Sequence, residues 1–96
     1  MRILGRDKLE AFKQKHPQSR KPLNAWLAEA TQATWAQWAD IKADYPRADW
    51  LGNKRVVFDI KGNAFRLVVL VYFKMGQVIV ERVGTHAEYD KWQLKR

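Results

Sequence analysis

The stretch from residue 53 to residue 90 constrains the fold more than any other part of the chain. Three segments rich in Val, Ile and Phe follow one another at residues 55–60, 65–74 and 77–83. This composition favours β-strands with buried faces. The pair Gly62-Asn63 between the first two segments suits a two-residue hairpin turn, and Met75-Gly76 gives a weaker signal of the same kind. The stretch therefore predicts two consecutive hairpins.

The hairpin register predicts which side chains share a face of this sheet. With two-residue loops, Arg66 lies opposite Asp59 in the first hairpin and opposite Thr85 in the second. One face is then apolar apart from Arg82, and we expect helices to cover it. Its apolar members are Val56, Phe58, Ile60, Leu67, Val69, Val71, Phe73, Val78 and Val80. The opposite face has a polar end, where Lys61, Asp59, Arg66, Thr85 and the adjoining His86 gather.

The first half of the chain predicts helices. Residues 8–16 have helical spacing, with Asp7 as the expected N-cap and Pro17 as the stop. A second helix has Pro22 in its first turn and runs to about residue 35. Residues 36–50 predict a short helical turn and a loop, which three tryptophans anchor against the sheet. A strand at residues 2–4 and a last helical turn at 87–94 complete a β-α-α-β-β-β order.

Composition limits the classes of function. The 96 residues predict one domain, residues 1–96, and carry 18 basic against 10 acidic side chains, a net charge of +8. Such a charge favours a polyanionic partner, nucleic acid above all, although a merely soluble basic domain has the same composition. The absence of Cys excludes disulfides and thiolate metal sites, and two His make no convincing metal site. The apolar run at 67–73 is too short to span a membrane, so we expect a cytoplasmic protein with no metal and no cofactor.

Basic side chains around one histidine suit RNA cleavage without a metal. The ribose 2′-hydroxyl supplies the nucleophile, and the protein supplies a base, an acid and positive charge. The candidate catalytic residues are Arg66, His86 and Lys61. Further RNA contacts are expected from Asn63, Lys54, Arg55, Lys74, Tyr89 and Lys91.

Structural alternatives stand beside each of these roles. Arg66 can simply pair with Asp59, and a lone histidine after Gly84-Thr85 can serve as a loop cap. A lysine beside a turn is usually only solvated, and Tyr89 can bury its ring.

Four segments resemble one known family. HPQSRKPLNAW (16–26), DIKADYPRAD (40–49), VVFDIKGNAFRLVV (56–69) and VGTHAEYDK (83–91) are similar to HigB toxins of bacterial type II toxin–antitoxin systems, within the RelE-like mRNA interferases. The resemblance implies an α+β fold of the RelE-like kind, with two N-terminal helices packed on a small, mainly antiparallel sheet. It implies mRNA cleavage coupled to translation on the ribosome, and neutralisation by a HigA antitoxin with a helix-turn-helix domain. Two other classes of function stand beside this enzyme: a non-catalytic basic module that binds RNA or the ribosome, and a structural partner in a repression complex.

By motif position, the family's strand arginine and its basic or histidine residue after the last strand correspond to Arg66 and His86. The sequence departs from the family pattern at two positions. Asp59 stands where Asn is common, and Phe65 where Tyr is common. Asp59 brings a negative charge to the expected site, which either weakens RNA binding or orients Arg66.

Overall fold

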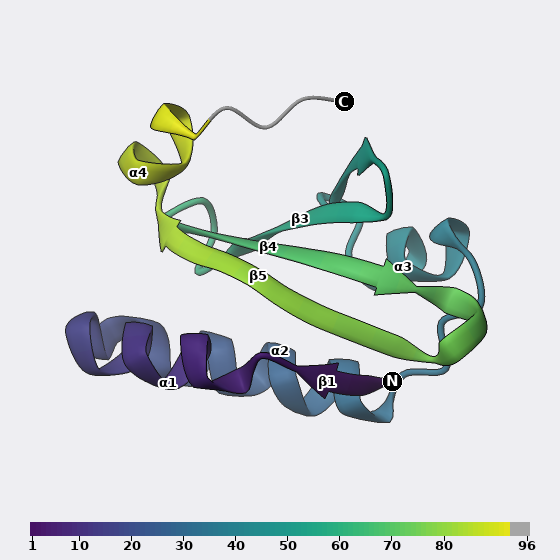
Figure 1. Cartoon of the computed structure of the whole chain (residues 1–96). Coiled ribbons are helices and arrows are strands. Elements are labelled where there is room, and N and C mark those ends of the chain that lie inside the picture. Colours follow the sequence, from purple (N-terminus) through teal and green to yellow (C-terminus); the bar gives the residue numbers. More distant parts are fainter. Residues whose placement is uncertain (93–96) are drawn as a thin grey trace.

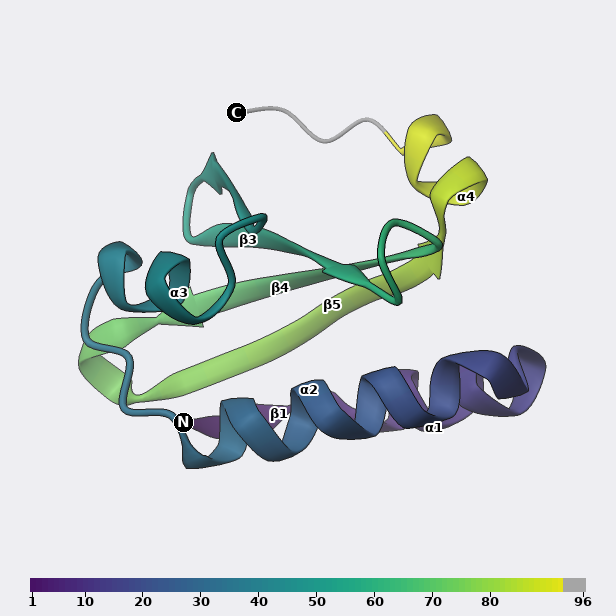
Figure 2. The same ribbon diagram turned by 180° about the vertical axis from the view of Figure 1, so that it is seen from behind.

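A five-stranded sheet with strand order β1-β5-β4-β3-β2 organises the structure, a computed structural model that describes residues 1–92. Strand β1 is parallel to β5, and the other neighbours are antiparallel. Helices α1 and α2 lie side by side under one face of the sheet, and α4 lies beyond the other face at one end (Figures 1 and 2). The elements are β1 (Arg2–Leu4), α1 (Arg6–Lys15), α2 (Arg20–Gln32), α3 (Trp38–Asp44), β2 (Asp49–Gly52), β3 (Arg55–Ile60), β4 (Phe65–Tyr72), β5 (Gln77–Thr85) and α4 (His86–Lys91). The expected α+β class and edge strand at 2–4 are confirmed.

The main core lies between this sheet and the two helices, on the face that the alternation of residues predicts. The inward residues of β3, β4 and β5 are buried together with Leu9, Leu23 and Trp26 of the helices. The Trp26 ring packs edge-on against Phe58, with 5.4 Å between the ring centroids. Burying these side chains supplies the main driving force for the fold.

The helix boundaries differ from those predicted. Helix α1 begins at Arg6 after Gly5, so Asp7 lies in its first turn and is not its cap. Gly5 has a φ of +80°, and a Cβ there would lie 2.8 Å from the carbonyl oxygen of Val80. Glycine therefore lets the chain turn from β1 into α1 against β5.

Helix α2 is displaced toward the N-terminus relative to the prediction. It starts at Arg20, two residues before Pro22, and it ends at Gln32 because Ala33 is extended. Past this end, the Trp35 ring stacks on the Phe58 ring, with 6.1 Å between the ring centroids, and its indole N–H donates a hydrogen bond to Asp44. Packing of Trp35 on the sheet thus replaces a further helical turn.

The connection before β3 contains more regular structure than predicted. The short helical turn is confirmed as α3, but residues 49–52 form the extra strand β2, which pairs with β3. The Trp38 and Trp50 rings pack together, with 5.6 Å between their centroids, and both pack against the core, as expected of anchoring tryptophans. A four-residue edge strand depends on its neighbour, so local pattern does not reveal it.

The first hairpin has the predicted register, with Arg66 opposite Asp59. Its loop differs in detail, because Lys61 and Gly62 have positive φ angles in place of Gly62 and Asn63. In the second hairpin β4 ends at Tyr72, since residues 73–75 form a 3₁₀ turn. Tyr72 therefore pairs with Gln77, whereas the predicted two-residue loop at Met75-Gly76 would pair Lys74 with Gln77.

A β-bulge changes the second half of β5. Val80 pairs with Val69 and Arg82 with Val68, which leaves Glu81 as an extra residue. Two predictions are wrong, because the early end of β4 shifts the register by two residues and the bulge then shifts it back by one. Arg66 lies opposite Gly84, not opposite Thr85, and Arg82 lies on the face away from α1 and α2.

Helix α4 begins with a capping box. The hydroxyl of Thr85 accepts the Glu88 backbone N–H at 3.1 Å, and the Glu88 carboxylate accepts the Thr85 backbone N–H at 2.8 Å. The helix was expected at 87–94 but includes His86 and runs to Lys91; Leu94 lies outside the described residues. No helix within residues 1–92 is long and apolar enough to cross a membrane.

Candidate functional site

Helix α4 covers one end of the sheet face that α1 and α2 leave open. A second apolar cluster of Leu51, Val57 and Val68 is buried on this face, and Tyr89 and Trp92 pack against it. These contacts hold α4 against the sheet. They also bring the start of the helix, with His86, beside the loop of the first hairpin.

Asp59 joins two arginines on this face. Its Oδ1 lies 3.2 Å from Nη1 of Arg66, and its Oδ2 lies 3.2 Å from Nη2 of Arg47. The side chains of Arg66 and Asp59 are only 13% and 18% exposed, whereas that of Arg47 is 68% exposed. The carboxylate therefore holds one shielded guanidinium and one that faces solvent.

Arg66 has two more contacts that fix its orientation. Its Nη1 donates a hydrogen bond to the Asn63 carbonyl oxygen at 3.0 Å. Its guanidinium carbon lies 5.5 Å from the centroid of the Tyr89 ring, in the range of a cation–π contact. Hairpin, hairpin loop and α4 thus converge on one cation.

His86 is fastened to the same hairpin loop. Its backbone N–H donates to the Ala64 carbonyl oxygen at 3.0 Å, and its Nε2 lies 3.5 Å from Oδ2 of Asp90, one helical turn later. The His86 side chain is 50% exposed, so it is accessible to a large substrate. Lys61 and Asn63 are exposed in the adjoining loop.

The structure separates Lys54 and Lys74 from this site. Lys54 and Lys74 line a groove of about 550 Å³ with Tyr72 and Trp50, at the end of the sheet where β4 meets β5 through the second turn. The Lys54 ammonium lies 5.6 Å from the Tyr72 ring centroid. Lys91 is exposed on α4.

Arg55 is engaged within the chain. It donates two hydrogen bonds to the carboxylate of Glu81, at 2.8 and 2.9 Å. These bonds raise the pKa of Arg55 above its ordinary value. Arg55 therefore has less free charge to offer a phosphate than its neighbours have.

Sequence reasoning missed two arginines of this face. The only sequence signal for Arg47 is its place in the family-like segment 40–49. Its pairing with Asp59 joins parts of the chain that are separate in sequence. Arg82 was assigned to the helix-covered face, but the bulge places its guanidinium 5.2 Å from the Trp92 ring centroid. Both side chains are exposed, and both lie on the sheet face that carries Arg66.

This arrangement can bind phosphate and move a proton. Guanidinium groups bind phosphate oxygens through several parallel hydrogen bonds, and an imidazole exchanges protons near neutral pH. Within residues 1–92, no group of three or more His, Asp or Glu side chains could hold a metal ion. The side chains that the site brings together for this chemistry are its cations, its imidazole and its phenol.

Comparison with known proteins gives a consistent match. A family model described as HigB_toxin, the RelE-like toxic component of a toxin–antitoxin system, matches residues 19–92. The chain is 28% identical over 92 residues to the mRNA interferase toxin HigB of Escherichia coli strain K12, covering 94% of this chain and 88% of the relative. The mRNA interferases HigB of E. coli O157:H7 and Shigella flexneri match with the same identity and coverage.

Proposed function

Because the chain belongs to the HigB family of RelE-like toxins of toxin–antitoxin systems, we propose that it is an endoribonuclease that cleaves mRNA on the translating ribosome. The relatives that carry the name mRNA interferase support this activity. The structural observation that carries the proposal is the fixed guanidinium of Arg66, held by Asp59 and Asn63 beside the helix that presents His86. The partner that neutralises the toxin is an antitoxin, and we infer the HigA type, with a helix-turn-helix domain.

The proposed reaction uses the RNA itself as the nucleophile. The ribose 2′-oxygen forms a bond to the adjacent phosphorus, and the bond from phosphorus to the 5′-oxygen breaks. A base takes the proton of the 2′-hydroxyl, and an acid protonates the leaving 5′-oxygen. The products are a 2′,3′-cyclic phosphate and a 5′-hydroxyl. The reaction needs no metal, because cationic side chains can stabilise the charge of the phosphorane-like transition state.

The residues of the site fit distinct parts of this reaction. Arg66 stabilises the transition-state charge, because a guanidinium keeps its charge and donates several hydrogen bonds. His86 transfers a proton, since its imidazole is half exposed on α4, the helix whose Tyr89 contacts Arg66. Lys61 adds charge from the hairpin loop. Tyr89 holds the Arg66 guanidinium from the α4 side.

The remaining cations extend the path of the RNA. Arg47 and Arg82 flank the site, and we propose that they contact phosphates next to the cleaved bond. Asn63 and Lys91 contact the RNA around the site. Lys54 and Lys74 contact RNA or ribosome at the far end of the sheet.

The proton-transfer role of His86 is tested with His86→Gln. On a ribosome already carrying mRNA, the variant should cleave roughly 10²–10⁴-fold more slowly in a single turnover, the usual scale of general acid–base catalysis. Its affinity for the ribosome should change little. The matched control is His16→Gln, which should cleave at nearly the wild-type rate. The His16 ring packs against Phe12 on the helix side of the sheet, with 4.5 Å between the ring centroids.

Two results would contradict the assignment. Cleavage of His86→Gln at the wild-type rate would move proton transfer to Lys61, Tyr89 or the ribosome. Growth arrest that persists in both Arg66→Ala and His86→Ala, with folding intact, would show a toxin that acts by binding and not by cleavage.

A further inference from the structure

Strand β5 has a free edge along its second half. Strand β1 pairs only with Gln77, Val78 and Ile79, because Gly5 turns the chain into α1 beside Val80. Within residues 1–92, no strand lies on that side of residues 81–85. An uncovered strand edge can accept a further strand through its backbone hydrogen-bonding groups.

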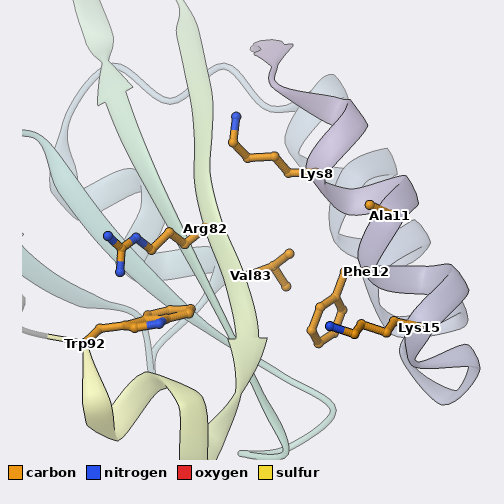
Figure 3. A pocket seen from close by; sticks show the side chains of 7 residues that line it. All are labelled: Lys8, Ala11, Phe12, Lys15, Arg82, Val83 and Trp92. Atoms are coloured by element: carbon orange, nitrogen blue, oxygen red, sulfur yellow. The ribbon is translucent and has the colours of Figure 1, made fainter.

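A groove runs along this edge between α1 and the end of β5. Its α1 side consists of Lys8, Ala11, Phe12 and Lys15, which share one face of the helix by their spacing of three and four residues. Arg82, Val83 and Trp92 complete the lining, and the groove has a volume of about 340 Å³. Figure 3 shows Val83 on the side of Phe12, while Arg82 extends across β5 toward Trp92. We call these seven residues the β5 groove.

The β5 groove is apolar at its centre and positive at its margins. Phe12 is buried and Val83 is half-buried, whereas the side chains of Lys8, Lys15 and Arg82 are exposed. The nearby acid is Glu88, whose carboxylate caps α4 and whose pKa is lowered first by the Thr85 backbone hydrogen bond and further by Lys15 and His16. The seven lining residues include three cations and no carboxylate, so the groove has an excess of positive charge.

From this geometry we propose that the β5 groove binds an extended, acidic segment of the antitoxin, which adds to the free edge of β5 as a strand. Because Glu88 already accepts the Thr85 backbone N–H, residues 81–84 offer the open edge, roughly 13 Å long and enough for about four residues of the partner. Apolar side chains of the segment lie over Phe12 and Val83, and acidic ones reach Lys8, Lys15 and Arg82. The inference rests on the antitoxin partner and not on RNA cleavage.

The lining favours a peptide over RNA. Single-stranded RNA binds best to cations combined with open aromatic faces on which bases stack. In the β5 groove Phe12 is 7% exposed, and the Trp92 ring already carries the Arg82 guanidinium at 5.2 Å. A strand edge, in contrast, pairs directly with the backbone of a peptide.

The test measures binding of the purified, full-length cognate antitoxin to the full chain carrying Arg66→Ala, so that RNA cleavage plays no part. The double variant Lys8→Glu/Lys15→Glu should weaken binding at least tenfold and reduce its salt dependence. Arg20→Glu/Lys21→Glu, on exposed positions of α2, makes the same change in net charge and should shift the affinity less than threefold.

A second variant and a backbone measurement complete the test. Ala11→Trp should block the β5 groove and weaken binding, whereas Ala25→Trp, at an exposed position of α2, should not. Hydrogen exchange of amides in residues 81–84 should slow when the antitoxin binds. Wild-type affinity in both groove variants, or unchanged exchange there, would overturn the proposal. So would variants that keep antitoxin affinity but lose ribosome affinity, because the groove would then be an RNA contact.

Discussion

Asp59→Asn probes how the carboxylate between Arg47 and Arg66 serves the site. The substitution keeps the size of the side chain and one oxygen but removes the negative charge. Arg66 would keep the Asn63 carbonyl oxygen and the Tyr89 ring as partners. Stability and cleavage rate should then fall, whereas RNA affinity should rise.

The loss of stability follows from the burial of the pair. Breaking a fully buried ion pair costs about 3–5 kcal/mol, and an exposed pair contributes about 0–1 kcal/mol. Asp59 and Arg66 are 18% and 13% exposed, and Asn can still accept a hydrogen bond. We therefore expect a loss of about 1 kcal/mol, which lowers the Tm of a domain of this size by roughly 4–8 °C.

RNA affinity should increase while cleavage slows. A phosphate about 7 Å from the Asp59 carboxylate is repelled by about 0.6 kcal/mol in water, so removing the charge strengthens binding about threefold. The loosened guanidinium would fit the transition state less well, and a misplacement of this kind costs up to about 10²-fold in rate. The expected signature is tighter binding together with slower single-turnover cleavage.

The assay combines three measurements on the same protein. Thermal unfolding reports stability, ribosomes carrying mRNA with a 2′-deoxy residue at the cleaved position report affinity, and intact mRNA reports the rate. Asp7→Asn, at an exposed position of α1, controls for net charge. An unchanged rate with unchanged stability would refute the reasoning, because Asp59 would then not hold Arg66 in place.

The remaining predictions concern the core, the RNA path and α4. Val69 is fully buried, so Val69→Asp should unfold the domain, and a cooperative melt close to that of wild type would contradict the placement. Lys61→Gln and Lys74→Gln should each reduce the slope of log affinity against log salt by about 0.7–0.9. An unchanged slope for Lys74→Gln would show that the RNA does not reach the second turn. The bond from Thr85 lowers the pKa of Glu88, so this carboxylate stabilises α4 above the unfolded pKa of about 4.3 and loses that effect as pH falls through its lower folded pKa. Protection of α4 amides from exchange should decline at acid pH, and Glu88→Gln should remove this dependence.

The sequence by itself determines the two hairpins and the buried face of the sheet. Alternation with a period of two, together with turn residues, specifies which side chains of β3 and β4 face the helices. The pairing of Arg66 with Asp59 follows in the same way, because a single short loop separates the two residues. Such features depend on neighbours in the chain, and therefore their residue pattern is sufficient to predict them.

The tertiary structure alone decides what surrounds Arg66. The bulge at Glu81 has no local sequence signal, yet it moves Arg82 to the open face, and together with the early end of β4 at Tyr72 it places Gly84 opposite Arg66. Arg47 reaches Asp59 only because strand β2 pairs with β3 and brings the preceding loop to the hairpin. The free edge of β5 exists because Gly5 ends β1 at the point where the chain meets Val80. Each of these features comes from contacts between segments far apart in the sequence, where packing decides between alternatives that local pattern leaves equal.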